Sequence, residues 1–306
     1  MLKDNGKINF LIDIHSTYAE ALTGGIVAMH KLAYEIAKRG HNVYTFCEPH
    51  YPHENISVIN SQKNGNLDIW EPFTFNITNT VSVYPQIRRD NPFNTKHVVR
   101  WLLYHTEKDV EKGYGDDDYI LNFGSFKTHN LKEDGQLSLI DFGFDKFFDR
   151  KQKRRGICHL NHKNTHIHSD LFFKELNSTD LSDWKEKGSF SYMAEKLNEH
   201  EYFYTYDEKS FWAFTAALCG CKVVICNPFN SSNSDEYEHN GEKLTPTEYR
   251  LQNPLMAFGV AYGAEDLNWA IETQKFVYDH LKELEKIQEK QLDKFISYWE
   301  QKILMG

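Results

Sequence analysis

Residues 201–228 read EYFYTYDEKSFWAFTAALCGCKVVICNP, and the stretch predicts a strand, a turn, a helix and a second strand. The aromatic run at 201–205 suits a strand that is buried on both faces. Between Phe211 and Leu218, side chains suited to one buried face recur at helical spacing. Gly220 is expected to end that helix, and the β-branched run at 222–226 then predicts an inner strand of a parallel sheet.

The turn in this stretch is a candidate binding site. Backbone amides at the start of a helix have no partner within the helix, and they attract an anion such as a diphosphate. Ser210 is expected to add its hydroxyl to a phosphate oxygen, and Tyr206 to stack on a base or pack against a ribose. Asp207 and Glu208 favour a helix N-terminus, with Asp207 as the expected N-cap. An ordinary strand–helix–strand unit without a ligand is the alternative explanation of the same pattern.

Length and composition limit the class of protein. A chain of 306 residues exceeds what one core usually supports, so two domains are expected. The formal net charge of −9 argues against a nucleic-acid binder. No apolar run approaches the ~20 residues of a membrane helix, and the polar start of the chain does not resemble a signal peptide, so we expect a cytoplasmic protein. The five cysteines lack paired zinc-site spacing and predict buried, reduced thiols.

The N-terminal half predicts a strand at 8–14, a polar loop that Gly24 and Gly25 close, a helix from Ile26 that Gly40 stops, and a second strand at 41–46. This unit implies a parallel sheet with a right-handed crossover. Gly24 and Gly25 follow the carboxyl end of the first strand, where open α/β sheets bind ligands and where glycine permits close approach. The G-x-G-x-x-G fingerprint is absent, which disfavours a dehydrogenase.

Further elements are predicted less regularly along the chain. Strands are expected at 80–84, 119–123, 136–140, 156–160 and 258–263. Helices are expected at 98–103 and from 265 to the C-terminus, and residues 183–199 are expected to form one helix or two short ones. The basic run at 149–155 is predicted to be a solvated boundary between domains, with attraction to an anionic lipid surface as its alternative role. These elements divide the chain into domains at 1–150 and 151–264 and a C-terminal helix at 265–306.

The segment at 159–170 contains several histidines, but their spacing matches no common metal motif. We therefore expect no metal site there and interpret the segment as a polar loop that faces the cleft, with Lys163 able to bind phosphate. The apolar stripe of the C-terminal helix is expected to pack across both domains, and a coiled-coil partner is the alternative use.

Two stretches resemble motifs of GT-B nucleotide-sugar glycosyltransferases. GGIVAMHKLAYEIAKRGHNVYTF (24–46) is similar to their Gly-Gly loop and first helix, and YDEKSFWAFTAALCGCKVVI (206–225) to their C-terminal donor motif. YPQIRRDNPFNTKHVVRWLL (84–103) and FGVAYGAEDLNWAIETQ (258–274) resemble stretches of bacterial and viral polysaccharide transferases. The resemblance implies an α/β protein with two Rossmann-like domains facing a cleft and a long C-terminal helix that packs across both.

The resemblance also implies an activity in polysaccharide biosynthesis. A sugar would pass from a nucleotide-diphosphate donor to a hydroxyl of a glycan or lipid-linked acceptor, without a metal and with no cofactor beyond the donor. The residues expected to hold the donor are Gly24, Gly25, Arg155, Lys163, Tyr206, Asp207, Glu208 and Ser210. Asp13 and His15 are the candidate bases by their place at the end of the first strand, and Arg88 and Arg100 are further phosphate candidates.

One departure from the family pattern leaves alternatives open. Retaining members often carry a Glu-x7-Glu pattern, and Asp207 and Thr215 stand at those two places in this chain. The sequence therefore leaves open whether transfer would invert or retain the anomeric configuration. A non-catalytic nucleotide-sugar or glycan-binding protein and a nucleotide-sugar epimerase of the same fold remain as alternative functions.

Overall fold

The stretch at 201–228 forms the predicted strand–helix–strand unit in a computed structural model of the chain. It contains β10 (Tyr202–Thr205), α5 (Phe211–Leu218) and β11 (Lys222–Ile225), and β10 pairs with β11 in parallel. Gly220 has φ +94°, so the predicted left-handed end of the helix is confirmed. The structure describes residues 8–14, 24–46, 57–59, 78–104, 106, 108–124, 128, 130–160, 171–185, 190–207, 210–226, 238–239, 242–243 and 245–304.

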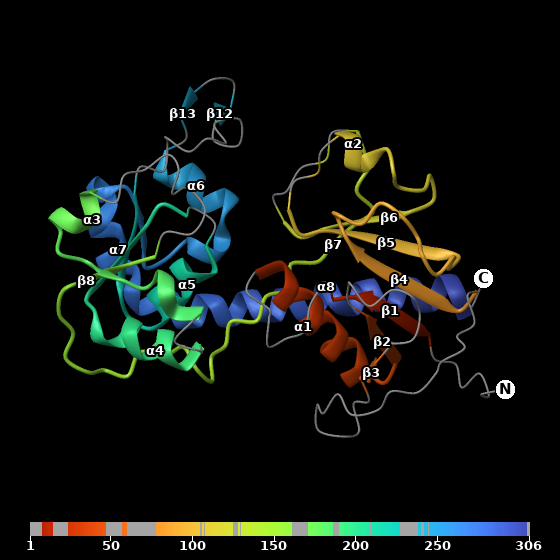
Figure 1. Cartoon of the computed structure of the whole chain (residues 1–306), viewed down its shortest axis with the longest axis horizontal. Helices are drawn as coiled ribbons and strands as arrows, with labels where there is room; N and C mark the ends of the chain where they lie inside the picture. Colours follow the sequence, from red (N-terminus) through yellow and green to blue (C-terminus); the bar gives the residue numbers. More distant parts are fainter. Residues whose placement is uncertain are drawn as a thin grey trace. The chain divides into compact units, whose positions relative to one another are not determined.

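The chain folds into two compact units (Figure 1). Unit 1 comprises Met1–Asp141 and Glu285–Gly306, and unit 2 comprises Phe142–Leu284. The boundary between the first part of unit 1 and unit 2 therefore lies between Asp141 and Phe142, before the boundary predicted at residue 150. The basic run at 149–155 belongs to unit 2. Both units are α/β structures with parallel sheets, which is compatible with a two-domain Rossmann-like fold.

Unit 1 contains a seven-stranded sheet with the order β3-β2-β1-β4-β5-β6-β7. All neighbouring strands are parallel except β2 and β3. The elements are β1 (Asn9–Asp13), α1 (Gly24–Lys38), β2 (Asn42–Phe46), β3 (Ser57–Ile59), β4 (Thr80–Pro85), β5 (His97–Leu102), α2 (Lys108–Glu111), β6 (Tyr119–Asn122) and β7 (Gly135–Gln136). The long helix α8 (Val277–Leu304) begins in unit 2, and its residues from Glu285 onward belong to unit 1.

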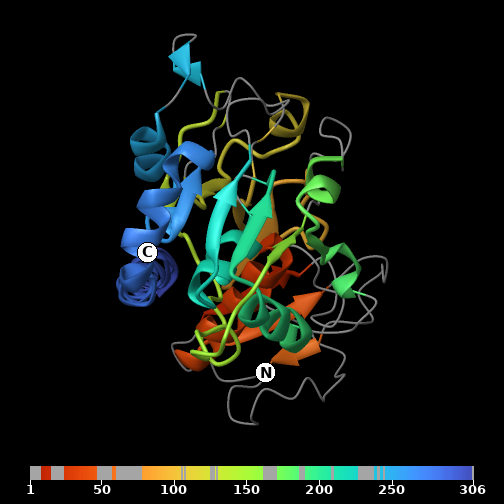
Figure 2. The same cartoon turned by 90° about the vertical axis from the view of Figure 1, so that its left-hand side faces the viewer.

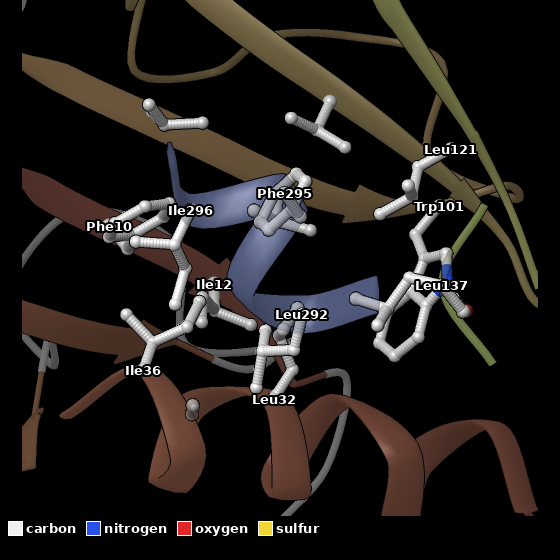
Figure 3. Packing of buried hydrophobic residues seen from close by; sticks show 14 of the residues in the cluster. Phe10, Ile12, Leu32, Ile36, Trp101, Leu121, Leu137, Leu292, Phe295 and Ile296 are labelled. Atoms are coloured by element: carbon white, nitrogen blue, oxygen red, sulfur yellow. Dashed lines mark hydrogen bonds between the residues drawn. The ribbon is translucent and has the colours of Figure 1, made fainter. Parts of the chain in front are cut away.

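One face of the unit 1 sheet packs against α1 and α8 (Figure 3). Alternate residues of β1 face this layer, while Leu11 between them joins a smaller cluster. Burial of each large apolar side chain in such a layer stabilises the fold by about 1.5–3 kcal/mol. The layer combines Phe10 and Ile12 of β1, Leu32 and Ile36 of α1, Trp101 of β5, and Leu292, Phe295 and Ile296 of α8.

Unit 2 contains a five-stranded parallel sheet with the order β14-β11-β10-β8-β9 (Figure 2). Its strands are β8 (Ile157–His159), β9 (Thr179–Asp180), β10, β11 and β14 (Val260–Tyr262), and a separate antiparallel pair is formed by β12 (Glu238–His239) and β13 (Glu242–Lys243). Its helices are α3 (Leu171–Glu175), α4 (Phe190–Glu199), α5, α6 (Pro246–Gln252) and α7 (Leu267–Thr273), with 3-10 turns at Ser182–Lys185, Pro254–Met256, Ala264–Asp266 and Gln274–Phe276.

Three predicted elements differ from the structure. The predicted helix at 98–103 is wrong, because His97–Leu102 forms the strand β5, in which every residue is buried. A run rich in β-branched residues and buried on both faces suits the interior of a parallel sheet. The predicted strand at 136–140 is reduced to β7, and the C-terminal helix predicted from 265 is divided into α7, a 3-10 turn and α8.

The basic run at 149–155 is not a fully solvated linker as predicted. Arg154 donates to Asp149 at 2.6 Å, to the Asn198 side chain at 3.0 Å and to the backbone carbonyl of Leu197 at 2.9 Å. The side chain of Arg154 is 14% exposed, so its guanidinium is built into unit 2. A buried cation requires such partners, and periodicity along the chain does not reveal them.

Four cysteines lie in unit 2, and all of them are buried and reduced. Burial raises the pKa of Cys219 and of Cys226 to about 12, and it also raises the pKa of Cys221. The prediction of buried thiols is therefore confirmed for these cysteines, and Cys47 lies outside the described residues.

Candidate functional site

The strand order of unit 1 reverses at β1. Strands β2 and β3 lie on one side of β1, and β4 to β7 lie on the other. In open parallel sheets, a crevice forms outside the carboxyl ends of the strands at such a switch point, and ligands bind there. Asp13 is the last residue of β1, and α1 begins where the chain returns from that edge. We call the carboxyl ends of β1 and β4, with the residues that follow them, the unit 1 edge.

Asp13 and Arg88 meet at the unit 1 edge. Asp13 is 1% exposed, and its Oδ2 accepts a hydrogen bond from Arg88 Nε at 3.0 Å. Arg88 Nη1 also lies 3.6 Å from the carboxylate of Asp90. A buried carboxylate engaged by a guanidinium is better suited to orient that arginine than to take a proton from a substrate. His15, the other predicted base, lies outside the described residues.

Gly24 and Gly25 are the first two residues of α1, whose first turn contains no acidic residue. Among the described residues outside α1 itself, no heavy atom lies within 4 Å of a Cβ placed on Gly24, and the nearest to one on Gly25 is Leu103 Cβ at 3.6 Å. The described residues therefore leave the backbone at the start of α1 open to close approach. The topology brings this helix start to the same edge of the sheet as Asp13.

Arg100 was a candidate phosphate ligand, but the structure gives it a different role. It is 1% exposed, and its guanidinium donates to Asp118 and to the backbone carbonyls of Arg88 and Asp90. These bonds fix the loop after β4 from inside the fold. Arg100 therefore supports the unit 1 edge without lying on it.

The strand order of unit 2 reverses at β8, which lies between β9 and β10. We call the carboxyl ends of β8 and β10, with the start of α5, the unit 2 edge. Ser210 is the N-cap of α5, and its Oγ accepts a hydrogen bond from Trp212 N at 3.1 Å. Because this oxygen accepts, the hydroxyl proton of Ser210 is not used in the capping bond. Ala213 N donates to Ser210 O at 3.1 Å, so two amides of the first turn are already occupied.

Asp207 does not cap α5, contrary to prediction, because Ser210 takes that position. Asp207 is 4% exposed, and its backbone N–H donates to Thr205 Oγ1 at 3.0 Å. The ring of Tyr206 is also buried and packs edge-on against Phe173, with their centroids 5.4 Å apart. This environment does not suit the predicted stacking of Tyr206 on a base. Glu208 and Lys163 lie outside the described residues.

His159 lies at the unit 2 edge and is not among the predicted site residues. It ends β8, is 7% exposed, and stacks on Phe173 with centroids 4.0 Å apart and planes at 10°. Its Nδ1 lies 2.9 Å from Ser178 Oγ, and its Nε2 lies 3.7 Å from Asp180 Oδ1. The sequence signal is its place in the strand predicted at 156–160, although the histidine pattern groups it with the polar residues that follow.

Asp180 completes the surroundings of His159. Burial alone would raise the pKa of the Asp180 carboxyl, but hydrogen bonds from Ser182 and the charge of His159 hold this pKa below its usual range. Among the described residues, no three His, Cys, Asp or Glu side chains are grouped so that they could hold a metal ion. Within the described residues, His159 is therefore surrounded by the Phe173 ring, the Ser178 hydroxyl and the Asp180 carboxylate.

Arg155 is not brought to the unit 2 edge. It is exposed and precedes β8, and its backbone N–H donates to Glu199 O at 3.1 Å. The first and last residues of β8, Ile157 and His159, are two residue steps apart, or about 7 Å, and Arg155 lies two positions before the strand begins.

Thr215, which stands at the second place of the Glu pattern of retaining glycosyltransferases, is fully buried. Its hydroxyl donates to the carbonyls of Phe211 and Trp212 at 3.1 and 3.2 Å, within its own helix.

Comparisons with known proteins do not assign the chain to a family. No model of a known protein family matches it, and the search of curated proteins gives no match. Among the described residues, no helix combines the length and the apolar character needed to cross a membrane.

Proposed function

We propose that the chain is a glycosyltransferase that moves a sugar from a nucleotide-diphosphate donor to a hydroxyl of a glycan or lipid-linked acceptor. The observation that supports this proposal most is the path of the chain. Two successive units contain parallel sheets, each with a switch point, and the last helix contributes Leu292 and Phe295 to the core of the first unit. This path agrees with the resemblance to GT-B enzymes at residues 24–46 and 206–225.

In the proposed reaction, the bond between the anomeric carbon and the donor phosphate oxygen breaks. Its electron pair leaves with the nucleoside diphosphate, while the acceptor oxygen bonds to the anomeric carbon and loses its proton. The protein must therefore stabilise the negative charge of the leaving diphosphate. The Ser210 hydroxyl at the start of α5 is the proposed contributor within unit 2. Within unit 1, the helix start at Gly24–Gly25 and the guanidinium of Arg88 are proposed to bind an anionic part of a substrate.

The proposal assigns no role to a metal ion, as the resemblance to metal-independent GT-B enzymes implies. Helix-start amides and a guanidinium can supply the positive potential that a divalent cation supplies in other transferases. We expect sugar transfer to continue in the presence of excess EDTA. Loss of transfer on chelation and its recovery on addition of Mg²⁺ or Mn²⁺ would contradict this part of the proposal.

The first experiment is a thermal-shift screen of the whole chain against nucleoside diphosphates and nucleotide sugars. A ligand that binds the native state at 100 times its Kd stabilises it by about 2.7 kcal/mol. We expect one nucleoside diphosphate to raise the Tm, and its sugar conjugates to be hydrolysed slowly when no acceptor is present. A flat response to every nucleotide would reject the proposed function.

A non-catalytic nucleotide-sugar or glycan-binding protein is the second candidate. The observation that favours it is Thr215, a buried residue bonded within its own helix where retaining enzymes often place a glutamate. Such a protein would show the same Tm increase with a nucleotide sugar. It would release neither free sugar nor nucleoside diphosphate on long incubation, with or without acceptor glycans.

A further inference from the structure

The loop that follows β4 presents an unusual combination of side chains at the unit 1 edge. Ile87 is 56% exposed, and two arginines, Arg88 and Arg89, follow it directly in a chain of net charge −9. Single exposed apolar residues are common, but this one lies at a switch point where open sheets bind ligands. We call residues Gln86, Ile87, Arg88, Arg89 and Asp90 the arginine loop.

The arginine loop is held from beneath by a buried cation. Arg100, on the neighbouring strand β5, donates from Nη1 to the carbonyl oxygens of Arg88 at 2.8 Å and Asp90 at 2.9 Å. Its Nε donates to Asp118 Oδ2 at 2.7 Å, which compensates the guanidinium charge inside the fold. Burial of a guanidinium is costly, so a site that uses one to bind two loop carbonyls selects one loop conformation over others.

Two tyrosines complete this support. The Tyr84 and Tyr114 rings each lie 5.0 Å from Arg100 Cζ, within the range of a cation–π contact. The Tyr114 hydroxyl donates to the carbonyl of Gln86. Burial raises the pKa of Tyr114 to about 12, so the hydroxyl keeps its proton and remains a donor at neutral pH.

The side chain of Arg88 is also fixed in direction. Its backbone carbonyl is bound by Arg100, and its own Nε is bound by the buried carboxylate of Asp13. A guanidinium held at both its backbone and its side chain loses little conformational entropy when an anion binds. Bidentate recognition of a phosphate or carboxylate benefits from such preorganisation.

We propose that the arginine loop is a preformed recognition element for an anionic group of the substrate, a phosphate or a carboxylate, and that Arg100 is the positioning residue that sets its shape. Arg88 and Arg89 bind the anion, and Ile87 packs against the apolar part of the same molecule. The proposal deepens the proposed function, on which it rests for the identity of the substrate. It also makes a claim about the free protein that holds whether or not a sugar is transferred.

The first test uses Tyr114→Phe, which removes the hydrogen bond to the Gln86 carbonyl and preserves the ring beside Arg100. The matched control is Tyr34→Phe, the same substitution at a tyrosine of α1 that is 52% exposed and lies outside the arginine loop and its support. Amide hydrogen exchange of the arginine loop is measured in the free protein by mass spectrometry. We expect the amides of the arginine loop to exchange faster in Tyr114→Phe than in the wild type, and at the wild-type rate in the control. Equal exchange rates in the two variants would overturn the positioning role.

The second test measures binding of inorganic pyrophosphate and of glucuronate, with glucose as the neutral control, by calorimetry on the whole chain. We expect at least one anion to bind, and Tyr114→Phe to weaken it by about tenfold, the cost of one lost preorganising bond. Arg100→Lys keeps the charge but lacks the guanidinium's fork of donors, which binds Asp118 from Nε and two loop carbonyls from Nη1, so it is expected to weaken binding further. Binding of neither anion, or equal affinity in all variants, would reject the inference.

The outcomes separate this inference from the proposed function. Loop-dependent binding of pyrophosphate without any sugar transfer would support the recognition loop and reject the transferase. Sugar transfer with unchanged kcat and KM in Tyr114→Phe would support the transferase and reject the loop. If both proposals hold, Tyr114→Phe raises KM for the anionic substrate more than it lowers kcat, because the loop binds the substrate in both the ground and transition states.

Discussion

The Nε atom of Arg88 lies 3.0 Å from the carboxylate of Asp13, although the two residues are 75 positions apart in the chain. The contact joins the ends of β1 and β4, the two strands at which the unit 1 sheet reverses its order. The Asp13 side chain is 1% exposed and that of Arg88 is 11% exposed, so most of the pair is removed from water. Because a buried pair loses much when one partner is removed, this contact separates stability from function in a testable way.

Arg88→Gln is expected to lower the free energy of unfolding by about 3 kcal/mol, because it removes the guanidinium that binds the buried Asp13 carboxylate. The double variant Asp13→Asn/Arg88→Gln removes both charges and is expected to recover most of that stability. It is not expected to recover binding of pyrophosphate or of a nucleoside diphosphate. Urea unfolding and calorimetry measure the two quantities. Wild-type affinity in the double variant would show that Arg88 has no role in binding.

Ser210 is the second residue at which structure and binding can be separated. Ser210→Ala removes the cap of α5 and is expected to cost about 1 kcal/mol, whereas a glycine cap costs only a few tenths of that. Ser210→Gly therefore removes the hydroxyl with little loss of stability. We expect both variants to show a smaller Tm increase with nucleoside diphosphate, and Ser210→Thr to keep the increase. If Ser210→Gly responds like the wild type, the hydroxyl does not contact the ligand.

The strand–helix–strand unit of unit 2 could be predicted from sequence because its signals are local. The aromatic run of β10, the helical spacing of α5 and the left-handed Gly220 all lie within one short stretch. Local patterns failed at β5, where valines, Arg100 and Trp101 fit a helical face as well as a strand. The difference was decided by burial on both faces of the sheet, which depends on residues far away in the chain.

The candidate sites were predicted as separate residues, and their partners could not be. Asp13 and Arg88 were both candidates, but no spacing in the sequence indicates that they are paired. Arg100 and Arg154 look like surface cations in the sequence, and only the tertiary structure reveals the carbonyls and carboxylates that bury them. Long-range polar contacts of this kind leave no periodic signal.

Helix α8 is expected to be essential for the stability of unit 1. Trp299 is 1% exposed and belongs to the hydrophobic core between the unit 1 sheet and helices α1 and α8. Trp299→Ala is therefore expected to lower the free energy of unfolding by about 3–5 kcal/mol. Glu289→Ala changes an exposed residue of the same helix and is expected to remain within about 0.5 kcal/mol of the wild type. Chemical denaturation of the whole chain measures both. Equal stability of the two variants would contradict the role of α8 in the unit 1 core.

His97 is expected to make unit 1 less stable in mild acid. Burial lowers the pKa of His97, and the nearby charges of Lys302 and Lys96 lower it further. The unfolded chain therefore takes up this proton first as the pH falls. The stabilising contribution is complete above the ordinary histidine pKa of about 6.5, and it is lost progressively as the pH falls from there through the lower pKa of the folded state.

The measurement is the free energy of unfolding at several pH values between 8 and 5, for the wild type, His97→Gln and Lys302→Met. His97→Gln removes the titrating group, so we expect its stability to fall less steeply below about pH 6.5 than that of the wild type. Lys302→Met removes one of the two positive neighbours and is expected to give an intermediate slope. The His97 ring centroid lies 5.5 Å from that of Trp299, so a general packing defect would lower stability at every pH equally. Parallel pH profiles for the wild type and His97→Gln would therefore exclude the titration of His97 as the cause.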